Sequence, residues 1–495
     1  MVSLYTSVKA LPLLVAGALA TASLPTKPAD LTTPVQQRIA VHGPNTISIG
    51  WNTYEKLDRP CVQYGLSRFA LFERACSTSS ITYPTSRTWA NSVALTGLFP
   101  ATTYYYKIVS SNSTVEQFFS PRMPGDKTPF AMNAIIDLGV YGADGYTIQM
   151  DMSKRDTIPF ISPSMNHTTI SRLAETINDY EFIIHPGDMG YADDWGMVPA
   201  DIDDSQNAYQ AILEQFFDQL APIAGRKPYM ASPGNHESAC QEPVGDCPNG
   251  QRNFTDFMTR FGNTLPTAFE STSHNFEAKV NANKAKLLAK PPFWYSFEYG
   301  MVHVTMLDTE TDFADAPDIP GGPSGLDSGP FGAPNQQLQF LEADLAAVDR
   351  KITPWVIVAG HRPWYSTGGP GCLPCQAAFE GLFYKYGVDL AVFGHVHNSQ
   401  RFMPVFNSTA DPAGMNNPKA PMYIVAGGAG NIEGLSDVGS NLSFNAFAYA
   451  DDYSYPTIKF LDPNNMQIDF FRSSTGELLD RSKLYKAHKH QFTVQ

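Results

Sequence analysis

The fold is decided by the stretch Phe182-Ile183-Ile184-His185-Pro186-Gly187-Asp188-Met189-Gly190-Tyr191, an apolar run that ends in glycine and then a carboxylate. Short apolar runs bounded by glycine are typical of buried strands. A similar design returns at residues 134–137, 355–361 and 389–395, with helix-like stretches such as 208–220 and 335–348 between the runs. Alternating strands and helices predict a layered α/β domain, with sheets flanked by helices. Polar residues at the strand ends lie where such folds place ligands.

Five short segments carry the side chains that could do chemistry. They are Asp137-Leu138-Gly139, Gly187-Asp188-Met189-Gly190-Tyr191, Gly234-Asn235-His236-Glu237, Gly360-His361-Arg362-Pro363 and Gly394-His395-Val396-His397. Such oxygen and nitrogen donors suit iron, zinc and manganese. No cysteine lies among them, so a zinc-finger type of site is not indicated. Each motif alone is more often an ordinary turn, and it is the five together that predict a metal site.

The residue types match the needs of a hydrolase with two metal ions. A carboxylate such as Asp188 can bridge two cations, and cations about 3.5–4 Å apart can hold the attacking and the leaving oxygen of a displacement. The glycine before each ligand lets the backbone turn tightly beside the metal. His395 and His397, two apart on a strand, would point to the same face, although an ordinary edge strand fits this pattern too.

These motifs, in this order and at these spacings, resemble the metallophosphoesterases. The tyrosine after Gly187-Asp188 narrows the resemblance to the purple acid phosphatases of the large plant and fungal type. The resemblance covers nearly the whole chain after the first 22 residues, including 294–307 and 455–469. It implies a binuclear centre with two sets of ligands. Fe(III) would be bound by Asp137, Asp188, Tyr191 and His397, and a divalent cation, Zn, Fe or Mn, by Asp188, Asn235, His361 and His395.

The resemblance also implies a reaction, the hydrolysis of phosphate monoesters at acid pH by attack of a metal-bound hydroxide. His236, next to Asn235, would contact the phosphate and stabilise or protonate the leaving oxygen. A core histidine at a strand end is the other interpretation of His236. The chain is therefore expected to be a secreted acid phosphatase.

Three alternatives to this activity stay open. A phytase would need a wide basic pocket, for which Lys284, Lys286 and Lys290 are candidates, although a solvated loop is the simpler interpretation and the one we prefer. A phosphodiesterase of the same superfamily is a weaker alternative, because diesterases of this fold usually lack the tyrosine found here at Tyr191. An inactive secreted binding protein is disfavoured because all seven ligand positions are intact. The natural substrate is not predicted.

One segment departs from the family pattern. Plant members carry further histidines in the loop after the Gly360-His361 motif, whereas residues 364–375 contain none. The second general acid is therefore not identified. Tyr365 or Arg362 could contribute, but neither is predicted to be catalytic. Cys372 and Cys375 have metal-like spacing, and in a secreted chain a small disulfide loop is the better interpretation.

The chain of 495 residues is expected to hold more than one domain. Residues 30–125 predict an all-β, fibronectin-III-like sandwich, with strands at 37–41, 46–51 and 101–108. This sandwich could support the catalytic domain or serve as an interaction module, and we favour support. Residues 130–495 form the predicted catalytic domain, with a C-terminal segment from about 450. The polar stretch 271–290 and the Gly-, Pro- and Asp-rich stretch 314–334 are expected to be loops or lids, with no predicted role.

The N-terminus predicts a signal peptide over residues 1–22, with Lys9, an apolar run and the small-x-small pattern Ala20-Thr21-Ala22. A membrane anchor is the alternative, but the apolar run is shorter than the roughly 20 residues that span a bilayer. We expect an extracellular or cell-wall protein with N-linked glycans. Candidate sequons begin at Asn112, Asn166, Asn253, Asn407 and Asn441.

Charge and cysteine content agree with a secreted enzyme that acts on small phosphorylated substrates. A net charge of -14 argues against a general binder of nucleic acid or anionic membranes. Six cysteines suggest disulfides, and we expect the local pairs 61–76, 240–247 and 372–375. Sequence alone leaves other pairings open, and Cys61 and Cys76 could join two chains. The oligomeric state is therefore not predicted.

Overall fold

The computed structural model describes residues 24–141, 168–197, 205–241, 247–368, 371–440 and 442–488. The expected signal peptide and the sequons at Asn166 and Asn441 lie outside the described residues. The sequon asparagines Asn112, Asn253 and Asn407 are exposed.

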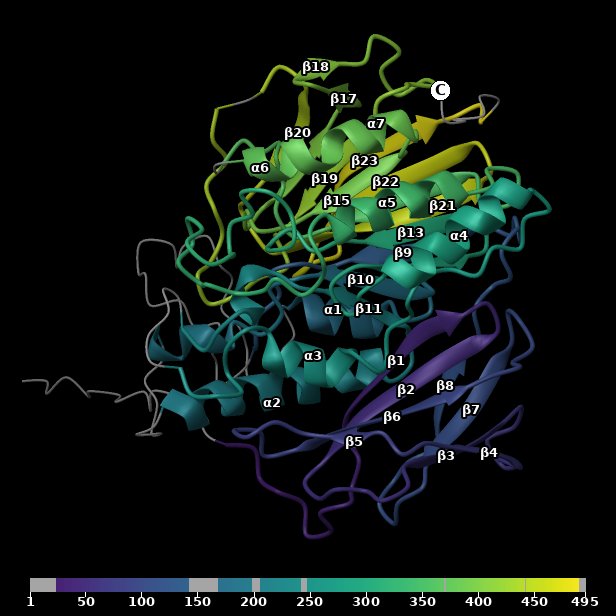
Figure 1. The fold of residues 1–495 in the computed structure, drawn as a ribbon, viewed down its shortest axis with the longest axis vertical. Helices are drawn as coiled ribbons and strands as arrows, with labels where there is room; N and C mark the ends of the chain where they lie inside the picture. Colours follow the sequence, from purple (N-terminus) through teal and green to yellow (C-terminus); the bar gives the residue numbers. More distant parts are fainter. Residues whose placement is uncertain are drawn as a thin grey trace, which may run out of the picture.

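Two four-stranded antiparallel sheets form the N-terminal sandwich (Figure 1). Apolar side chains such as Ile49, Trp51, Val62 and Tyr106 alternate along the strands and meet in a separate core between the sheets. The strands predicted at 37–41, 46–51 and 101–108 are present as β1, β2 and β7. The first sheet runs β1 (Val35–Gly43), β2 (Thr46–Thr53), β6 (Trp89–Leu95), β5 (Ser80–Ile81), and the second β4 (Glu73–Cys76), β3 (Cys61–Gly65), β7 (Thr103–Ile108), β8 (Glu116–Phe119).

Two mixed sheets lie at the centre of the rest of the described chain. In the six-stranded sheet β9, β10 and β11 are parallel, and β21 pairs antiparallel with β9. In the seven-stranded sheet β13, β14, β15 and β19 are parallel. The six-stranded order is β11 (Tyr229–Ser232), β10 (Phe182–Pro186), β9 (Phe130–Ala134), β21 (Ser454–Asp462), β22 (Asn465–Arg472), β23 (Leu478–Tyr485). The seven-stranded order is β12 (Tyr295–Tyr299), β13 (Val302–Met306), β14 (Trp355–Ala359), β15 (Leu390–Phe393), β19 (Met422–Ala426), β16 (Ser399–Phe402), β20 (Asn445–Tyr449).

Helices cover the sheets from both sides (Figure 1). The helix-like stretches 208–220 and 335–348 are helical, within α2 and α5. The helices are α1 (Thr169–Glu175), α2 (Ser205–Ala224), α3 (Thr255–Phe261), α4 (Phe276–Leu288), α5 (Gln336–Ala347), α6 (Leu373–Cys375) and α7 (Gly381–Lys385). Single helical turns are η1 (Ala192–Met197), η2 (Asn235–Glu237) and η3 (Gln376–Glu380), and a small hairpin joins β17 (Val405–Phe406) to β18 (Thr409–Ala410).

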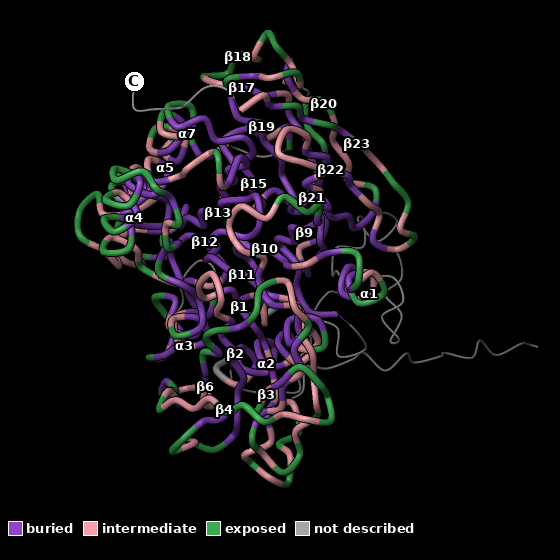
Figure 2. Tube along the Cα trace, turned by 90° about the vertical axis from the view of Figure 1, so that its right-hand side faces the viewer, coloured by how far each residue is buried: buried purple, intermediate pink, exposed green. Residues whose placement is uncertain are grey.

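The largest apolar core unites residues of both mixed sheets, with Phe182, Ile184, Val304, Ile357 and Ile458 among them. Figure 2 shows this buried material along the strands at the centre of the molecule. A second core lies under α5, η3 and α7. The predicted layered α/β architecture with an N-terminal β-sandwich is confirmed.

Polar contacts tie the sandwich to the catalytic part. Arg38 on β1 is buried, and its Nη2 donates to the carbonyl of Arg260 at 2.7 Å. The Tyr106 hydroxyl donates to the carbonyl of Gly225 at 2.7 Å. Because these groups are buried on both sides, separating the two parts would leave several hydrogen-bonding groups unpaired.

The expectation of a loop at 271–290 is wrong, because residues 276–288 form helix α4. Asn275 caps this helix by accepting from the backbone N–H of Glu277 at 2.8 Å. The small side chains Ala278, Ala282 and Ala285 are buried on one face, whereas the asparagines and lysines lie on the other faces. Such a polar helix with an alanine stripe has too weak an apolar pattern to be recognised from sequence. The stretch 314–334 is a loop, as expected.

The cysteines pair as expected, in the disulfides Cys61–Cys76, Cys240–Cys247 and Cys372–Cys375. Cys61 and Cys76 lie opposite each other on β3 and β4, within one chain. Within the residues described, no helix combines the length and the apolar character that crossing a membrane requires.

Candidate metal centre

The predicted ligands follow strands of both mixed sheets. Asp188 comes two residues after β10, and His361 two residues after β14. Asp137 follows β9, and His395 follows β15. Parallel strands end at the same edge of a sheet, so the two sheets together bring these side chains to one place.

Asp188 belongs to two groups of possible ligands. One group joins Asp188 with His361 and His395, and the other joins it with Asp137 and His397; within each group the ligand atoms lie within 4.8 Å of one another. The Oδ2 atom of Asp188 lies 3.0 Å from Nε2 of His361. One fully buried carboxylate is therefore shared by two clusters, which indicates a binuclear metal centre.

Tyr191 completes the group around Asp137. Its hydroxyl lies 3.1 Å from Oδ1 of Asp137, 3.4 Å from Oδ2 of Asp188 and 2.8 Å from Nε2 of His397. On the other side, Oδ1 of Asn235 lies 3.2 Å from Nε2 of His361. The seven predicted ligands therefore converge, although which cation each one binds stays a prediction.

Backbone carbonyls orient two of the imidazoles. Nδ1 of His361 lies 3.2 Å from the carbonyl oxygen of Pro186, and Nδ1 of His397 lies 3.1 Å from that of Gly434. A carbonyl only accepts, so each Nδ1 carries a proton, and Nε2 is the atom that each imidazole would offer to a cation at the centre. Metal-binding histidines are typically held in this way.

The backbone around the ligands is unusual. Asp137, Asp188, Tyr191 and His395 have φ angles of 60°, 52°, 52° and 64°, in the left-handed region that few residues other than glycine adopt. Such strain clusters at functional sites, where the surrounding structure must hold it. The expectation that His395 and His397 lie on a strand is wrong, since β15 ends at Phe393 and the positive φ of His395 breaks the extended run.

Glycine is required where other chains approach the ligands. A Cβ at Gly234 would collide with the Asp188 carboxylate, and a Cβ at Gly394 would collide with the side chains of Ile136 and Asp137. The glycines of these motifs therefore allow close packing around the carboxylates.

The charges of the side chains at the site are strongly divided. Burial disfavours the charged form of Asp188, but His361 and His236 outweigh it and hold the pKa of this carboxyl well below its ordinary value. Burial, with a further contribution from Asp188, raises the pKa of Asp137. Burial alone would lower the pKa of His361, yet Asp188 raises it to about 9. Asp188 and His361 thus form an ion pair.

The other ligands are held in their neutral forms. Burial lowers the pKa of His397 to about 4, which keeps its imidazole available as a lone-pair donor. Burial and the carboxylates of Asp137 and Asp188 raise the pKa of Tyr191 well above its ordinary value. A tyrosinate would therefore form here only with a strongly charged cation beside it.

Three carboxylates that support the site were not predicted. Glu237 accepts from the backbone N–H groups of Asp188, Met189 and Gly234 at 2.8–2.9 Å, and so fixes the loop that carries Asp188. Asp193 lies 2.8 Å from Nδ1 of His236. Glu433 lies 3.7 Å from Nδ1 of His397. Glu237 and Asp193 each sit within three residues of a predicted site residue, but lone carboxylates gave no signal of their own.

An open pocket of about 280 Å³ leads to the centre. Its described lining includes Asn235, His236, His395, His397 and Glu433. The imidazole of His236 packs against the ring of Tyr191, with ring centroids 4.1 Å apart, and its Nε2 lies 3.7 Å from Oδ2 of Asp188. His236 is therefore positioned at the pocket and not in the apolar core, although its catalytic role stays a prediction.

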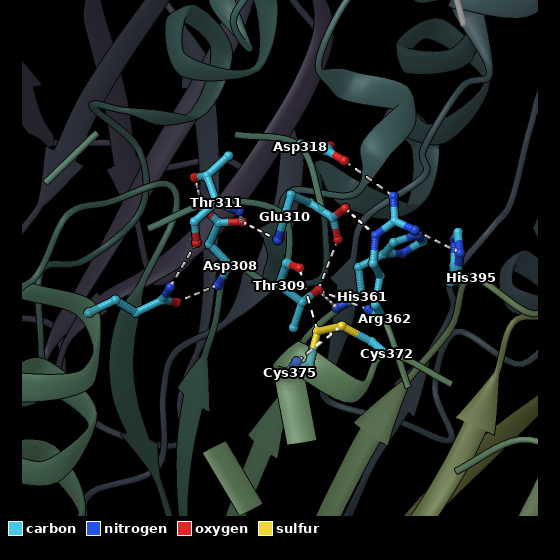
Figure 3. The surroundings of a disulfide bond; sticks show 11 residues. Asp308, Thr309, Glu310, Thr311, Asp318, His361, Arg362, Cys372, Cys375 and His395 are labelled. Atoms are coloured by element: carbon cyan, nitrogen blue, oxygen red, sulfur yellow. Dashed lines mark hydrogen bonds and ion pairs between the residues drawn. A yellow bond between two sulfur atoms is a disulfide. The ribbon is translucent and has the colours of Figure 1, made fainter. Parts of the chain in front are cut away.

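The two side chains considered for the missing general acid differ. The hydroxyl of Tyr365 donates to Glu380 at 2.5 Å, and Tyr365 packs in the second core. Arg362 instead extends toward the centre, where its Nη1 lies 2.9 Å from Nε2 of His395 (Figure 3).

Comparisons with known proteins agree with this geometry. Residues 34–122 match the N-terminal domain of purple acid phosphatases, residues 164–399 the calcineurin-like phosphoesterases, and residues 420–481 the iron/zinc purple acid phosphatase-like protein C. Acid phosphatase A of Cryphonectria parasitica is 64% identical over 504 residues, which cover 100% of both chains. The chain belongs to the purple acid phosphatase family.

More distant purple acid phosphatases and acid phosphatases share most of the chain. An acid phosphatase from Aspergillus ficuum is 28% identical over 80% of this chain and 75% of its own. The solved structure of a purple acid phosphatase from yellow lupin seeds is similar in fold, with a TM-score of 0.65, 22% identity and coverage of 92% of this chain and 74% of that one. The predicted enzyme class, a phosphatase of this family, is confirmed.

Proposed function

We propose that this purple acid phosphatase hydrolyses phosphate monoesters at acid pH with a centre of one Fe(III) and one divalent cation. The observation that carries the proposal is the shared carboxylate of Asp188, which lies in both groups of possible ligands. Two cations held here would make water a stronger nucleophile and offset the negative charge that develops on the phosphate oxygens. The donor set fits such cations, because it combines buried carboxylates, a phenol, an amide and imidazoles.

The two groups differ in a way that supports unlike cations. Asp137, Tyr191 and Asp188 can together supply up to three negative oxygen donors, which favour a hard trivalent cation. Asn235, His361 and His395 are neutral donors, which suit zinc, divalent iron or manganese. We therefore assign Asp137, Asp188, Tyr191 and His397 to Fe(III), and Asp188, Asn235, His361 and His395 to the divalent cation.

His236 is proposed as the catalytic residue that handles the leaving group. Its Nδ1 lies 2.8 Å from the carboxylate of Asp193, and both side chains are buried. This carboxylate stabilises the imidazolium form and turns the ring so that Nε2 faces Asp188 and the pocket. A proton held at Nε2 can pass to the departing alcohol oxygen.

A small monoester fits the pocket better than a polyanion. The described residues that line it include the acidic Glu433 but neither lysine nor arginine. The lysines considered for phytase activity lie on or just after α4, where Lys286 is exposed and pairs with Glu270 at 3.4 Å. Phytase and diesterase activities therefore remain alternatives without a supporting contact.

The proposal is tested by comparing substrates and metal content on one preparation. We expect purified protein to cleave 4-nitrophenyl phosphate with an acidic optimum and to cleave bis(4-nitrophenyl) phosphate and phytate at least ten-fold more slowly. Faster turnover of phytate, or of the diester, would contradict the substrate assignment. Activity that survives complete removal of metal would contradict the centre itself.

The same proposal includes secretion. Disulfides are typical of proteins that fold in oxidising compartments, and this chain has three of them within the described residues. Exposed sequon asparagines at 112, 253 and 407 are accessible to glycosylation. A mass shift after enzymatic removal of N-glycans from protein in culture medium is the expected result.

A further inference from the structure

Arg362 lies among three partners that come from separate parts of the chain (Figure 3). Its Nε donates to Oε2 of Glu310 at 2.5 Å, and its Nη2 lies 3.4 Å from Oδ1 of Asp318. Its Nη1 lies 2.9 Å from Nε2 of His395. Glu310 and Asp318 are fully buried, and Asp318 comes from the long loop 314–334.

The backbone beneath this arginine is held firmly. The hydroxyl of Thr309 accepts from the backbone N–H groups of His361 and Arg362 at 3.0 and 2.8 Å. The disulfide Cys372–Cys375 packs below it, with Sγ of Cys375 3.7 Å from the carbonyl oxygen of Thr309. The backbone at His361 and Arg362 is therefore fixed, so Arg362 can move away from His395 only by a change in its side chain.

The contact with His395 uses a lone pair that a metal ion would also use. A guanidinium only donates, so Nε2 of His395 must accept, and its proton then sits on Nδ1. If a cation bound through Nε2, it would take this lone pair directly. If it bound through Nδ1, the proton would move to Nε2, which would then face Arg362 as a second donor. In both cases the hydrogen bond from Arg362 is lost.

We propose that Arg362 is an internal cation that competes with the divalent metal ion for His395 and so lowers the affinity of this half of the centre. The inference rests on the proposed binuclear function. In the metal-free protein, Arg362 holds His395 and balances the buried charges of Glu310 and Asp318. Metal binding at His395 costs this hydrogen bond, while the contacts with the two carboxylates can persist.

The competing interpretation gives the opposite result. If Arg362 merely orients His395 for the metal, its removal would loosen a ligand and weaken binding. If Arg362 competes, its removal strengthens binding. The variant Arg362→Lys separates competition for His395 from simple repulsion between two positive charges. Lysine keeps the positive charge between Glu310 and Asp318, but it lacks the guanidinium group that contacts Glu310, Asp318 and His395 at the same time.

The test titrates metal-free protein with Zn²⁺ against a chromophoric chelator, which resolves two dissociation constants. Asn235→Ala identifies the constant of the divalent group, because Asn235 lies in that group alone. For Arg362→Lys we expect this constant to fall about ten-fold, the effect of one charged hydrogen bond, while the other constant stays unchanged. Arg122→Lys is the matched control, since Arg122 also pairs with two carboxylates, Glu181 and Asp126, and should change neither constant.

An unchanged or increased constant in Arg362→Lys would overturn the inference. Circular dichroism shows whether Arg362→Lys folds. If it does not, the double variant Arg362→Gln with Glu310→Gln removes the arginine without leaving Glu310 charged. We expect this double variant also to lower the dissociation constant of the divalent group. Wild-type protein that binds no Zn²⁺ would overturn the proposed function as well. Two bound Zn²⁺ with no effect of Arg362→Lys would overturn only the role of Arg362.

Discussion

Asp188 and His361 form a buried ion pair, with Oδ2 of the carboxylate 3.0 Å from Nε2 of the imidazole and neither side chain exposed. The same Oδ2 lies 3.4 Å from the hydroxyl of Tyr191, in the other group of ligands. Two strands of different sheets, β10 and β14, are thus joined at their ends through one carboxylate. We therefore place both proposed cations beside the carboxylate of Asp188.

Asp188→Asn is expected to empty both halves of the centre, because the amide cannot bridge two cations as a carboxylate does. Bound metal should fall from about two ions per chain to less than one, and turnover should fall roughly a hundred-fold or more. Elemental analysis measures the bound metal, and steady-state kinetics on the same sample measure the turnover. Asp469→Asn is the control, since Asp469 is equally buried but pairs with Lys459 and Arg481. Loss of only one ion in Asp188→Asn would argue against a bridge.

Asp193→Asn tests the positioning of His236. Without the carboxylate at 2.8 Å, the imidazolium form is less stable, so His236 is protonated over a narrower pH range. We expect kcat to fall about ten-fold near the alkaline side of the optimum, with little change in KM or metal content. A pH profile of kcat for the wild-type protein and for Asp193→Asn measures this difference. Parallel losses at every pH would instead indicate a purely structural role for Asp193.

His303 predicts a pH dependence of stability that is independent of the metal site. Burial alone would lower its pKa, but Asp344, 2.9 Å from Nε2, raises it to about 9 from an ordinary value of 6.5. Since the folded state binds this proton more tightly than the unfolded state, the stabilisation is complete below pH 6.5 and is lost as pH rises through about 9. The loss is up to roughly 3 kcal/mol.

Urea unfolding at pH 6 and pH 9.5 measures this contribution. Between these pH values the free energy of unfolding should fall more in wild-type protein than in His303→Gln, whose side chain does not titrate. His303→Gln should also be less stable at pH 6, because the buried carboxylate of Asp344 keeps its hydrogen bonds from Ser296 and Thr305 but loses its positively charged partner. Equal pH dependence in the two proteins would show that His303 does not bind its proton more tightly when folded.

The N-terminal sandwich is expected to be needed for folding of the catalytic part. Arg38 and Tyr106 bond buried carbonyls across the boundary, and an isolated chain from residue 126 onward would expose these groups and the apolar surface around them. We expect this truncated chain to be insoluble, or to be digested much faster than the full protein in limited proteolysis. A soluble and active truncated enzyme would favour the interaction-module interpretation instead.

Sequence predicted the fold and the converging ligands because both leave strong local patterns. Apolar runs ending in glycine mark β10, β14 and β15, and the polar residues after them meet because parallel strands end at one edge. Helix α4 was missed because its buried face consists of alanines, which give little contrast with the polar positions around them. A pattern of apolar residues does not predict a helix that is stabilised mainly by its N-cap and by packing against other elements.

The supporting residues could not be predicted, because their roles depend on distant partners. Arg362 follows His361 directly in the sequence, but its contacts with Glu310 and Asp318 cross about 50 residues of sequence. Glu237 supports Asp188 from 49 positions away, through backbone N–H groups that carry no sequence signal. The positive φ angles of Asp137, Asp188, Tyr191 and His395 likewise could not be predicted, because single Asp, Tyr or His residues occur far more often with negative φ.

A visible absorption spectrum, with metal analysis on the same purified sample, tests whether the centre is a cation pair with tyrosinate on Fe(III). We expect a broad charge-transfer band, about one Fe(III) and one divalent ion (zinc, iron or manganese) per chain, and loss of the band in Tyr191→Phe. A colourless protein that holds only zinc or manganese and still cleaves phosphate esters would contradict the Fe(III) assignment of Tyr191. A band that persists in Tyr191→Phe would contradict it as well.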